Sequence, residues 1–311
     1  MKLVTFRASH HAQPSVGVVV SNEHIVDLAR HGAGKRPASM VDLLESGEVG
    51  LASARQAIDD FQAGRVKTGV YAASTIELLA PVPRPGKIVH TACNFTTHLA
   101  ELTTWRAPEW QAHNWNKFHY EHPTGFLEAP SSVVGPSAKV HIPVFTGQLD
   151  YEIEIGIVIG KEANNVAVED ALDHVAGYTI FNDLSARDIQ AREHANKVIL
   201  MGKSFVGSCP FGPYLVTRDE FPDDLDLSME LTLNGEVRQR ASTAQMRYSP
   251  RALVSWWSLM SLQPGDIITS GSPPGVIAGS PNPVWLRAGD RIDARVSQLG
   301  TLTTFIAEKR Q

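Results

Sequence analysis

Two glutamates separated by one residue stand at the start of a long apolar run. Residues 150–160 read DYEIEIGIVIG, which places Glu152 and Glu154 just before Ile155–Ile159. In a β-strand both carboxylates lie on one face, about 6.5–7 Å apart. Like charges in an apolar setting need a positive charge between them, and a divalent cation is the simplest one. The alternative is a solvated edge strand whose glutamates face water.

A third oxygen ligand follows in Asp183. It comes directly after the predicted strand Tyr178–Phe181 and before a helix predicted over Ala186–Asn196. Carboxylate oxygens suit Mg²⁺, with Mn²⁺ and Ca²⁺ as alternatives, and the lack of thiolate partners argues against zinc. Mg²⁺ keeps several positions for water, so three carboxylates leave room for a bidentate substrate. The alternative for Asp183 is an ordinary helix N-cap.

A histidine and a glutamate, His98 and Glu101, stand three residues apart and therefore share one face of a predicted helix. A carboxylate beside a histidine fixes the tautomer of the ring and raises its basicity, as activation of a water molecule requires. The alternative is an exposed helical pair that contributes little to stability.

Three further segments offer groups that suit contact with an anion. Arg187 and Gln190 lie on one face of the predicted helix. Lys203 follows a glycine, beside which the backbone can approach a ligand closely. The small-residue loop around Gly271 and Ser272 offers free amides and hydroxyls for a carboxylate. Surface charge and ordinary turn chemistry explain each of these features equally well.

Strands and turns dominate the chain that must position these groups. Asn234-Gly235 separates two β-rich runs and predicts a hairpin. Helical patterns are fewer, at 40–61, 168–174, 186–196 and 250–259. The β-rich runs lie at 3–6, 16–20, 24–28, 87–91, 140–143, 151–159, 178–181, 213–216, 227–233, 267–270, 291–296 and 301–307. No βαβ alternation and no glycine-rich nucleotide loop accompanies them. The fold class is α+β, mainly β.

Three prolines within residues 81–87 predict an extended connector, and we place a domain boundary there. Residues 1–80 form a small N-terminal α+β domain, and residues 88–311 form a larger β-rich domain. Residues 96–126 hold three of the tryptophans and four of the histidines. This segment is either a lid over the site or a helical excursion packed on the body.

Composition excludes several classes of partner. The chain has 311 residues and a net charge of −5, which argues against a nucleic-acid-binding protein. No stretch approaches the ~18 apolar residues of a membrane span, so no membrane partner is expected. Cys93 and Cys209 are too few and too far apart for a disulfide framework, and we expect a cytoplasmic protein.

The ordered set of motifs resembles the fumarylacetoacetate hydrolase (FAH) family, from about Pro85 to Ile306. The segment Cys93–Glu101 is similar to the lid segment of the family, with its His/Glu pair. The segments that resemble its turn, metal strand, third-ligand segment and later loops are, in order, 130–136, 151–161, 182–190, 202–205, 209–213, 264–266 and 270–273. Glu128 departs from the pattern, because many members have lysine there, and we expect it to make the mouth of the pocket less cationic. Val206 and Gly207 replace a more usual polar pair.

The resemblance implies a C-terminal mixed β-sandwich roll, a homodimer, and substrates that are β-diketo or 2-oxo acids. It places the divalent metal on Glu152, Glu154 and Asp183. The implied catalytic residues are His98, Glu101 and Lys203, and the implied substrate-binding residues are Arg187, Gln190, Gly271 and Ser272. Ser272 stands where the family usually has a threonine that binds a carboxylate.

The expected reaction is metal-dependent hydrolysis of a C–C bond in an acylpyruvate or a fumarylpyruvate-like β-diketo acid. His98, backed by Glu101, deprotonates a water molecule, and Lys203 neutralises the oxyanion. The alternatives are decarboxylation or keto–enol isomerisation of a 2-oxo or 2-hydroxydienoic acid in the breakdown of aromatic compounds. A further alternative is a family member that binds its ligand without catalysis.

Overall fold

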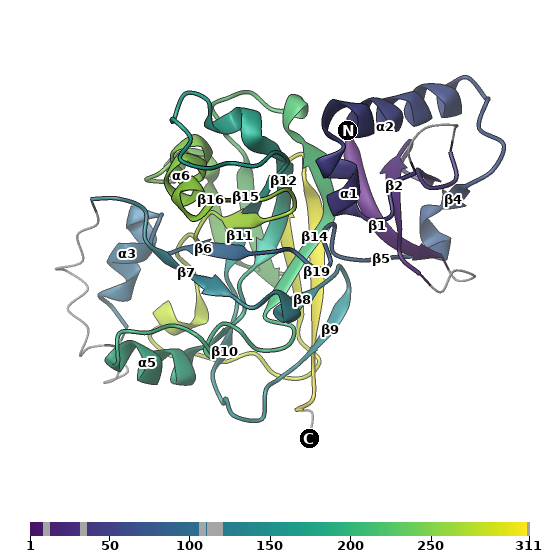
Figure 1. Ribbon diagram of the computed structural model, residues 1–311. Coiled ribbons are helices and arrows are strands. Elements are labelled where there is room, and N and C mark those ends of the chain that lie inside the picture. The colour runs from purple at the N-terminus through teal and green to yellow at the C-terminus, as the bar shows by residue number, and fades with distance from the viewer. Residues whose placement is uncertain (9–12, 32–35, 106–109, 111–120, 310–311) are drawn as a thin grey trace.

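The computed structural model describes residues 1–8, 13–31, 36–105, 110 and 121–309. Within them a large mixed sheet of 12 strands passes through the molecule (Figure 1). Its main path is β4 (Val70–Ala72), β3 (His24–Asp27), β2 (Ser15–Val19), β1 (Lys2–Ala8), β14 (Cys209–Thr217), β12 (Val175–Asn182), β11 (Ile153–Ile159), β17 (Ile267–Thr269), β6 (Ile88–Thr91) and β7 (Gly125–Glu128). Two short strands join this path at its side, β5 (Ile76–Leu78) on β1 and β8 (Val133–Val134) on β14.

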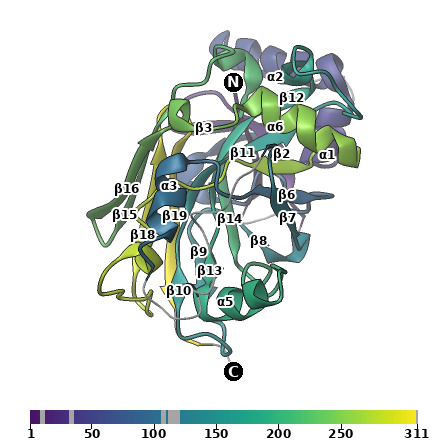
Figure 2. The ribbon, with the colours of Figure 1, turned by 90° about the vertical axis from the view of Figure 1, so that its left-hand side faces the viewer.

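A second sheet of five strands covers one side of the body, as Figure 2 shows at the left. Its order is β16 (Glu236–Ser242), β15 (Ser228–Leu233), β18 (Arg291–Val296), β19 (Gly300–Ala307) and β9 (Ala138–His141). Strands β10 (Leu149–Asp150) and β13 (Ser185–Ala186) form a separate small pair beside the ends of β11 and β12. Most pairs are antiparallel and three are parallel in the described residues, which confirms a mainly β, mixed architecture.

The central strands β11 and β12 are buried along their whole length. Side chains at odd positions of β11, such as Ile153 and Ile157, pack in the core between the two sheets. Val158, on the other face, packs in a second apolar cluster, to which the N-terminal strands and helices also contribute. This alternation is the one expected from the sequence, although β11 begins at Ile153 and leaves Glu152 just outside the strand.

The helices lie around the sheets. In Figure 1, α1 (Met40–Glu45) and α2 (Gly47–Gln62) lie at the upper right, and α3 (Thr96–Leu102) and α5 (Arg187–Ala195) lie at the left. Helix α6 (Pro250–Trp257) begins with a proline at its first position, where a missing amide is tolerated. No helix in the described ranges is long and apolar enough to cross a membrane.

Two helical expectations differ from the structure. The helix predicted over 40–61 is two helices, because Gly47 has a φ of +56° that breaks the run after Glu45. The helix predicted over 168–174 is only a 3₁₀ turn at Ala171–His174. The hairpin at Asn234-Gly235 is confirmed, since both residues have positive φ and Leu233 pairs with Glu236.

The predicted lid, residues 96–126, is only partly described, because residues 106–109 and 111–120 lie outside the described part. Its first part forms α3, and its last residues belong to β7, which pairs with β6. Trp105 and Trp110 are buried in a cluster with Leu102, Ala191 and Val276. The described part of this segment is therefore packed on the body.

Residues 1–80, predicted as a separate domain, share a sheet and a core with the rest. Strand β1 pairs with β14, with Leu3 opposite Leu215. Both leucines are fully buried in one apolar cluster that also includes Phe211. The proposed boundary at 81–87 stays a prediction, and the continuous sheet limits how independent the two parts can be.

We expect Leu3→Ala to lower the free energy of unfolding by about 2–5 kcal/mol, because the truncation leaves a cavity in this shared core. The matched control is Val49→Ala on the exposed face of α2, with an expected change within about 0.5 kcal/mol. Urea unfolding measures both. Equal, small effects of the two substitutions would contradict a shared core.

Candidate active site and metal centre

The dyad of His98, which is buried, and Glu101, which is half-buried, lies on α3 and faces the predicted metal ligands. His98 Nδ1 lies 2.8 Å from Glu101 Oε2, so this pair fixes the ring with its Nε2 directed away from Glu101. His98 Nε2 lies 4.0 Å from Glu152 Oε1. The amide of Gly275 donates to Glu101 Oε1 at 2.9 Å and anchors the glutamate. The exposed helical pair considered from the sequence is therefore excluded.

Glu152 is held by two buried cations. Arg187 Nη2 donates to Glu152 Oε1 at 2.6 Å, and Lys203 Nζ donates to Oε2 at 2.9 Å. Burial opposes the charge of this carboxylate, but Lys203 and Arg187 overcome the effect and lower its pKa below the ordinary value. Glu152 is therefore a carboxylate anion inside the protein.

Asp183 lies beside Glu152 because the chain continues the β11–β12 pairing beyond Ile153 and Asn182. The amide of Asp183 donates to the carbonyl of Glu152 at 2.9 Å. Lys203 Nζ donates to Asp183 Oδ2 at 2.6 Å. Asp183 Oδ1 is buried and has no hydrogen-bond partner among the described residues. Helix α5 begins four residues later, after Ala186, so Asp183 is not its N-cap.

Glu154, the second carboxylate of the pair, has no cation bonded to it in the described residues. The amide of Gly271 donates to its Oε2 at 3.0 Å. Burial, followed by the neighbouring charge of Asp183, raises the pKa of Glu154 from 4.5 to about 8. The two glutamates of one short motif thus have opposite pKa shifts, because the cations lie on one side of the cluster.

Arg187 and Gln190 lie together on α5, as their spacing predicts. Arg187 is fully buried and donates through Nε to Asp150 Oδ2 at 2.9 Å. Its Nη1 donates to Gln190 Oε1 at 3.0 Å, and the Trp105 ring lies 5.1 Å from the guanidinium carbon. The guanidinium therefore positions Glu152, and its predicted contact with substrate stays a prediction.

Ser272 lies in the loop that also provides the Gly271 amide. The side-chain amide of Gln239 donates to Ser272 Oγ at 2.9 Å, and Ser272 is 4% exposed. The predicted role of Ser272 and Gly271 in holding a substrate carboxylate stays a prediction. The structure nevertheless brings all ten predicted site residues into one connected region through the contacts described above.

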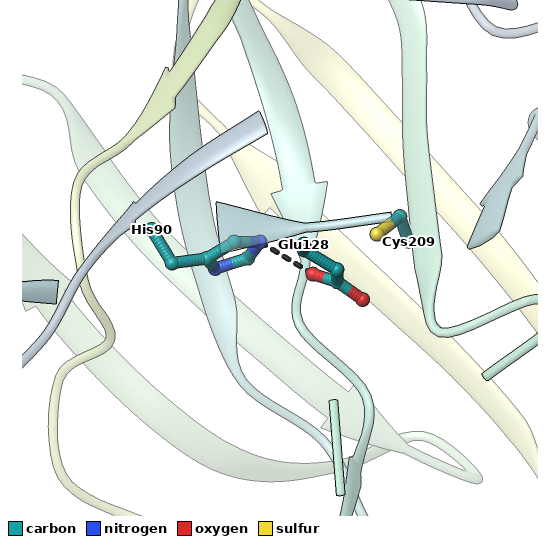
Figure 3. A group of neighbouring side chains, drawn as sticks. All are labelled: His90, Glu128 and Cys209. Carbon is teal, nitrogen blue, oxygen red and sulfur yellow. Dashed lines mark ion pairs between the residues drawn. The ribbon is translucent and has the colours of Figure 1, made fainter. Parts of the chain in front are cut away.

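Sequence reasoning missed His90 and misplaced Glu128. His90 Nε2 lies 2.5 Å from Glu128 Oε2, and both side chains are buried (Figure 3). Ser208 Oγ donates to Glu128 Oε1 at 2.5 Å. Glu128 is 3% exposed, so it does not line the mouth of a pocket as expected. Its carboxylate is instead balanced inside the protein by a histidine from the adjacent strand.

The ring of His90 also faces the carboxylate cluster. His90 Nδ1 lies 3.2 Å from Asp183 Oδ2 and 3.2 Å from Thr269 Oγ1. Burial disfavours the charged ring, but Asp183 and Glu128 overcome this effect and raise the pKa of His90 well above its ordinary value. The one signal in the sequence is a histidine that directly follows Ile88 and Val89 in the β-rich run at 87–91.

The donor set of this cluster fits a divalent cation. Glu154 has no cationic side chain bonded to it, and Asp183 Oδ1 is an unpartnered buried acceptor among the described residues. Ligand atoms of Asp183, Glu154 and His90 lie within 4.8 Å of one another. Such buried negative charge is stable only when a cation compensates it. Glu152 is not in this group, and its role as a ligand stays a prediction.

The chain is similar to known proteins of one family. Residues 87–307 match the family described as fumarylacetoacetate (FAA) hydrolase, C-terminal. The chain belongs to the fumarylacetoacetate hydrolase family. This assignment also confirms the FAH-type fold that the motifs predicted, and it makes the protein a member of an enzyme family.

The relatives of this FAH-family chain include proteins named as oxaloacetate tautomerases and a protein named as a hydrolase. It is 36% identical over 305 residues to the mitochondrial oxaloacetate tautomerase fahd2 of Xenopus laevis, covering 97% of this chain and 89% of the relative. It is also 36% identical over 304 residues to the oxaloacetate tautomerase YisK of Bacillus subtilis, covering 94% and 95%. A maleylpyruvate hydrolase from Sphingobium sp. SYK-6, solved with manganese(II) and pyruvate, matches with a TM-score of 0.74 and 26% identity over 100% of both chains.

We expect Glu154→Gln to change how the stability of the metal-free protein depends on pH. The pKa of Glu154 in the folded protein, about 8, lies above the ordinary 4.5. Its contribution to stability is therefore complete below 4.5 and is lost as the pH rises toward about 8. Over that range the free energy of unfolding of the wild type should fall relative to that of Glu154→Gln.

Urea unfolding in EDTA across this pH range measures the difference. The matched control is Glu77→Gln, which replaces an exposed glutamate on β5. Its curve should run parallel to that of the wild type. If the Glu154→Gln curve is also parallel, Glu154 does not have the raised pKa described above.

Proposed function

We propose that this enzyme catalyses the metal-dependent keto–enol tautomerisation of a short 2-oxo acid of the oxaloacetate class. The observation that carries the proposal is the His98–Glu101 dyad, in which the buried His98 directs its Nε2 toward the carboxylate cluster. Tautomerisation moves one proton between a carbon and an oxygen, and a histidine held beside the enolate is suited to that transfer. The names of the two tautomerase relatives support this choice of reaction.

Asp183 and Glu154, with Glu152 as the predicted third ligand, would hold the divalent ion. The bound ion supplies a Lewis acid that polarises the 2-oxo group and favours the enolate. His98 Nε2 takes the proton from the carbon and returns it to the oxygen, or the reverse. Glu101 holds the ring in the required tautomer and stabilises the imidazolium while the proton is on it.

Arg187 and Lys203 act on the ligands of the site. Arg187 fixes Glu152 against Asp150, and Lys203 joins Glu152 to Asp183. Both cations keep Glu152 ionised, as its lowered pKa indicates. They therefore maintain the negative charge that a divalent ion needs.

Hydrolysis of a C–C bond in a β-diketo acid is the second candidate. The same dyad can deprotonate a water molecule, and the maleylpyruvate hydrolase relative supports the reaction class. Lys203, the expected oxyanion partner, already donates to two carboxylates. Its charge is shared with them, which weakens its effect on a tetrahedral oxyanion and favours tautomerisation. The cytoplasmic location and the homodimer stay predictions.

We expect His98→Gln to lower kcat for oxaloacetate tautomerisation by about 10²- to 10⁴-fold, the usual loss when a general acid–base group is removed. The decay of the enol absorbance with Mg²⁺ or Mn²⁺ present, corrected for the uncatalysed rate, measures it. The control is His141→Gln, an exposed histidine on β9 that should leave the rate unchanged. Equal rates for His98→Gln and the wild type would remove the dyad from the mechanism.

Substrate comparison separates the two candidate reactions. With oxaloacetate we expect interconversion of keto and enol forms, followed by NMR, without enzyme-dependent loss of carbon dioxide. With an acylpyruvate we expect little release of pyruvate and the free acid. A higher kcat/KM for that release than for tautomerisation would make the protein a hydrolase instead, and rapid carbon dioxide release would make it a decarboxylase.

A further inference from the structure

The buried histidine His90 lies between two groups of acidic side chains, with one ring nitrogen directed to each. Nδ1 faces Asp183 in the carboxylate cluster, and Nε2 faces Glu128 on the adjacent strand β7. We propose that His90 is itself a metal ligand, binding the ion through Nδ1 together with Asp183 and Glu154. This inference rests on the metal dependence of the proposed function.

The first argument is distance. A ligand oxygen of Asp183, a ligand oxygen of Glu154 and a ring nitrogen of His90 lie within 4.8 Å of one another. The Nδ1–Oδ2 separation is 3.2 Å. Two ligand atoms bound at right angles to one ion, with bonds of about 2.1 Å, lie about 3 Å apart. The three side chains are therefore close enough to converge on a single ion.

The second argument is the partner of the other ring nitrogen. A histidine that binds a metal nearly always donates its remaining N–H to a carboxylate, a carbonyl or water, which fixes the tautomer and the ring orientation. Glu128 Oε2 lies 2.5 Å from Nε2 as an ion-pair contact, although neither atom has a partner with hydrogen-bond geometry among the described residues, and Ser208 Oγ donates to Glu128 Oε1. Nδ1 lies 3.2 Å from both Thr269 Oγ1 and Asp183 Oδ2, so the ion would bind the neutral ring, with its proton on Nε2, and replace the contact with Thr269.

The third argument is that the ring cannot turn away easily. Phe126 stacks on it, with ring centroids 4.8 Å apart and 7° between the planes. Phe181 contacts it edge-on, with centroids 5.3 Å apart. A ring held on two sides and at Nε2 keeps Nδ1 directed at Asp183, which is the preorganisation that a metal site needs.

A different ion site is possible in principle around Glu128, because Cys209 lies near it (Figure 3). Binding there requires the thiolate of Cys209 directly beside the Glu128 carboxylate, both fully enclosed by protein. Two adjacent buried anions are costly, and Glu128 already accepts from Ser208. The Asp183 side of the ring is the better place for the ion, because Glu154 has no cationic side chain bonded to it and Asp183 Oδ1 has no partner among the described residues.

A nitrogen ligand changes which metal the site prefers. Mg²⁺ strongly favours oxygen ligands, whereas Mn²⁺, Fe²⁺ and Zn²⁺ accept imidazole readily. The site should therefore bind Mn²⁺ more tightly than a site built from three carboxylates does. Mg²⁺ should gain much less from the presence of His90.

Pulsed electron paramagnetic resonance on the Mn²⁺-loaded protein tests the bond directly. Wild-type protein should show the coupling of a directly bound nitrogen to Mn²⁺, and labelling with [¹⁵N]histidine should convert it into the ¹⁵N pattern. The matched control is His98→Asn, which removes the other histidine near the cluster and should keep the coupling. His90→Asn should lose the coupling and bind Mn²⁺ at least about tenfold more weakly, with a smaller change for Mg²⁺.

Several results would overturn the proposal. The proposal is wrong if Mn²⁺ does not bind the wild type, or if it binds without nitrogen coupling. It is also wrong if the coupling disappears in His98→Asn but persists in His90→Asn. If His90→Asn does not fold, Glu128→Gln replaces it: it keeps His90 and should weaken Mn²⁺ binding about 10- to 100-fold. Unchanged Mn²⁺ affinity in that folded variant counts against the proposal.

The two proposals fail in different ways. Nitrogen coupling from His90 without tautomerase activity would leave His90 as a ligand and remove the proposed reaction. Tautomerase activity with Mn²⁺ bound only through oxygen would keep the reaction and remove His90 from the ligand set.

Discussion

Buried negative charge is the constraint on which the rest of this structure depends. Glu152, Glu154 and Asp183 lie inside the protein at the ends of two central strands, where an uncompensated carboxylate is unstable. Arg187 and Lys203 compensate part of this charge. They do so unevenly, because both bond to Glu152 and neither bonds to Glu154. The remaining charge defines where a cation must bind.

The sheet explains why these groups meet. Ile153 pairs with Asn182 at the end of the two strands. The residues just beyond this pair, Glu152 and Asp183, therefore lie side by side. Gly271 follows β17, the other neighbour of β11, and its amide therefore reaches Glu154. The predicted ligands thus lie on or beside adjacent buried strands, whereas the His98–Glu101 dyad lies on the separate helix α3.

The sequence predicts much of this site because its strongest signals are local. The alternation in the β11 run and the (i, i+3) spacings need only a few neighbouring residues to be interpreted, and the structure agrees with the faces they imply. His90 and Glu128 could not be predicted in this way. They become neighbours only through the pairing of β6 with β7. In the sequence, 33 residues separate Thr91 at the end of β6 from Gly125 at the start of β7. Each residue alone is typical of an ordinary strand.

The same buried charge links catalysis to stability. An ion that binds only the folded protein stabilises it, and carboxylates brought together before the ion arrives reduce the stability of the metal-free state. The raised pKa of Glu154 has the same origin, since a proton on Glu154 relieves the repulsion between carboxylates that a bound ion would also relieve. Hydrophobic residues in these positions would make a more stable core. The protein instead keeps an acidic cluster in its interior, as the proposed binding of a divalent ion requires.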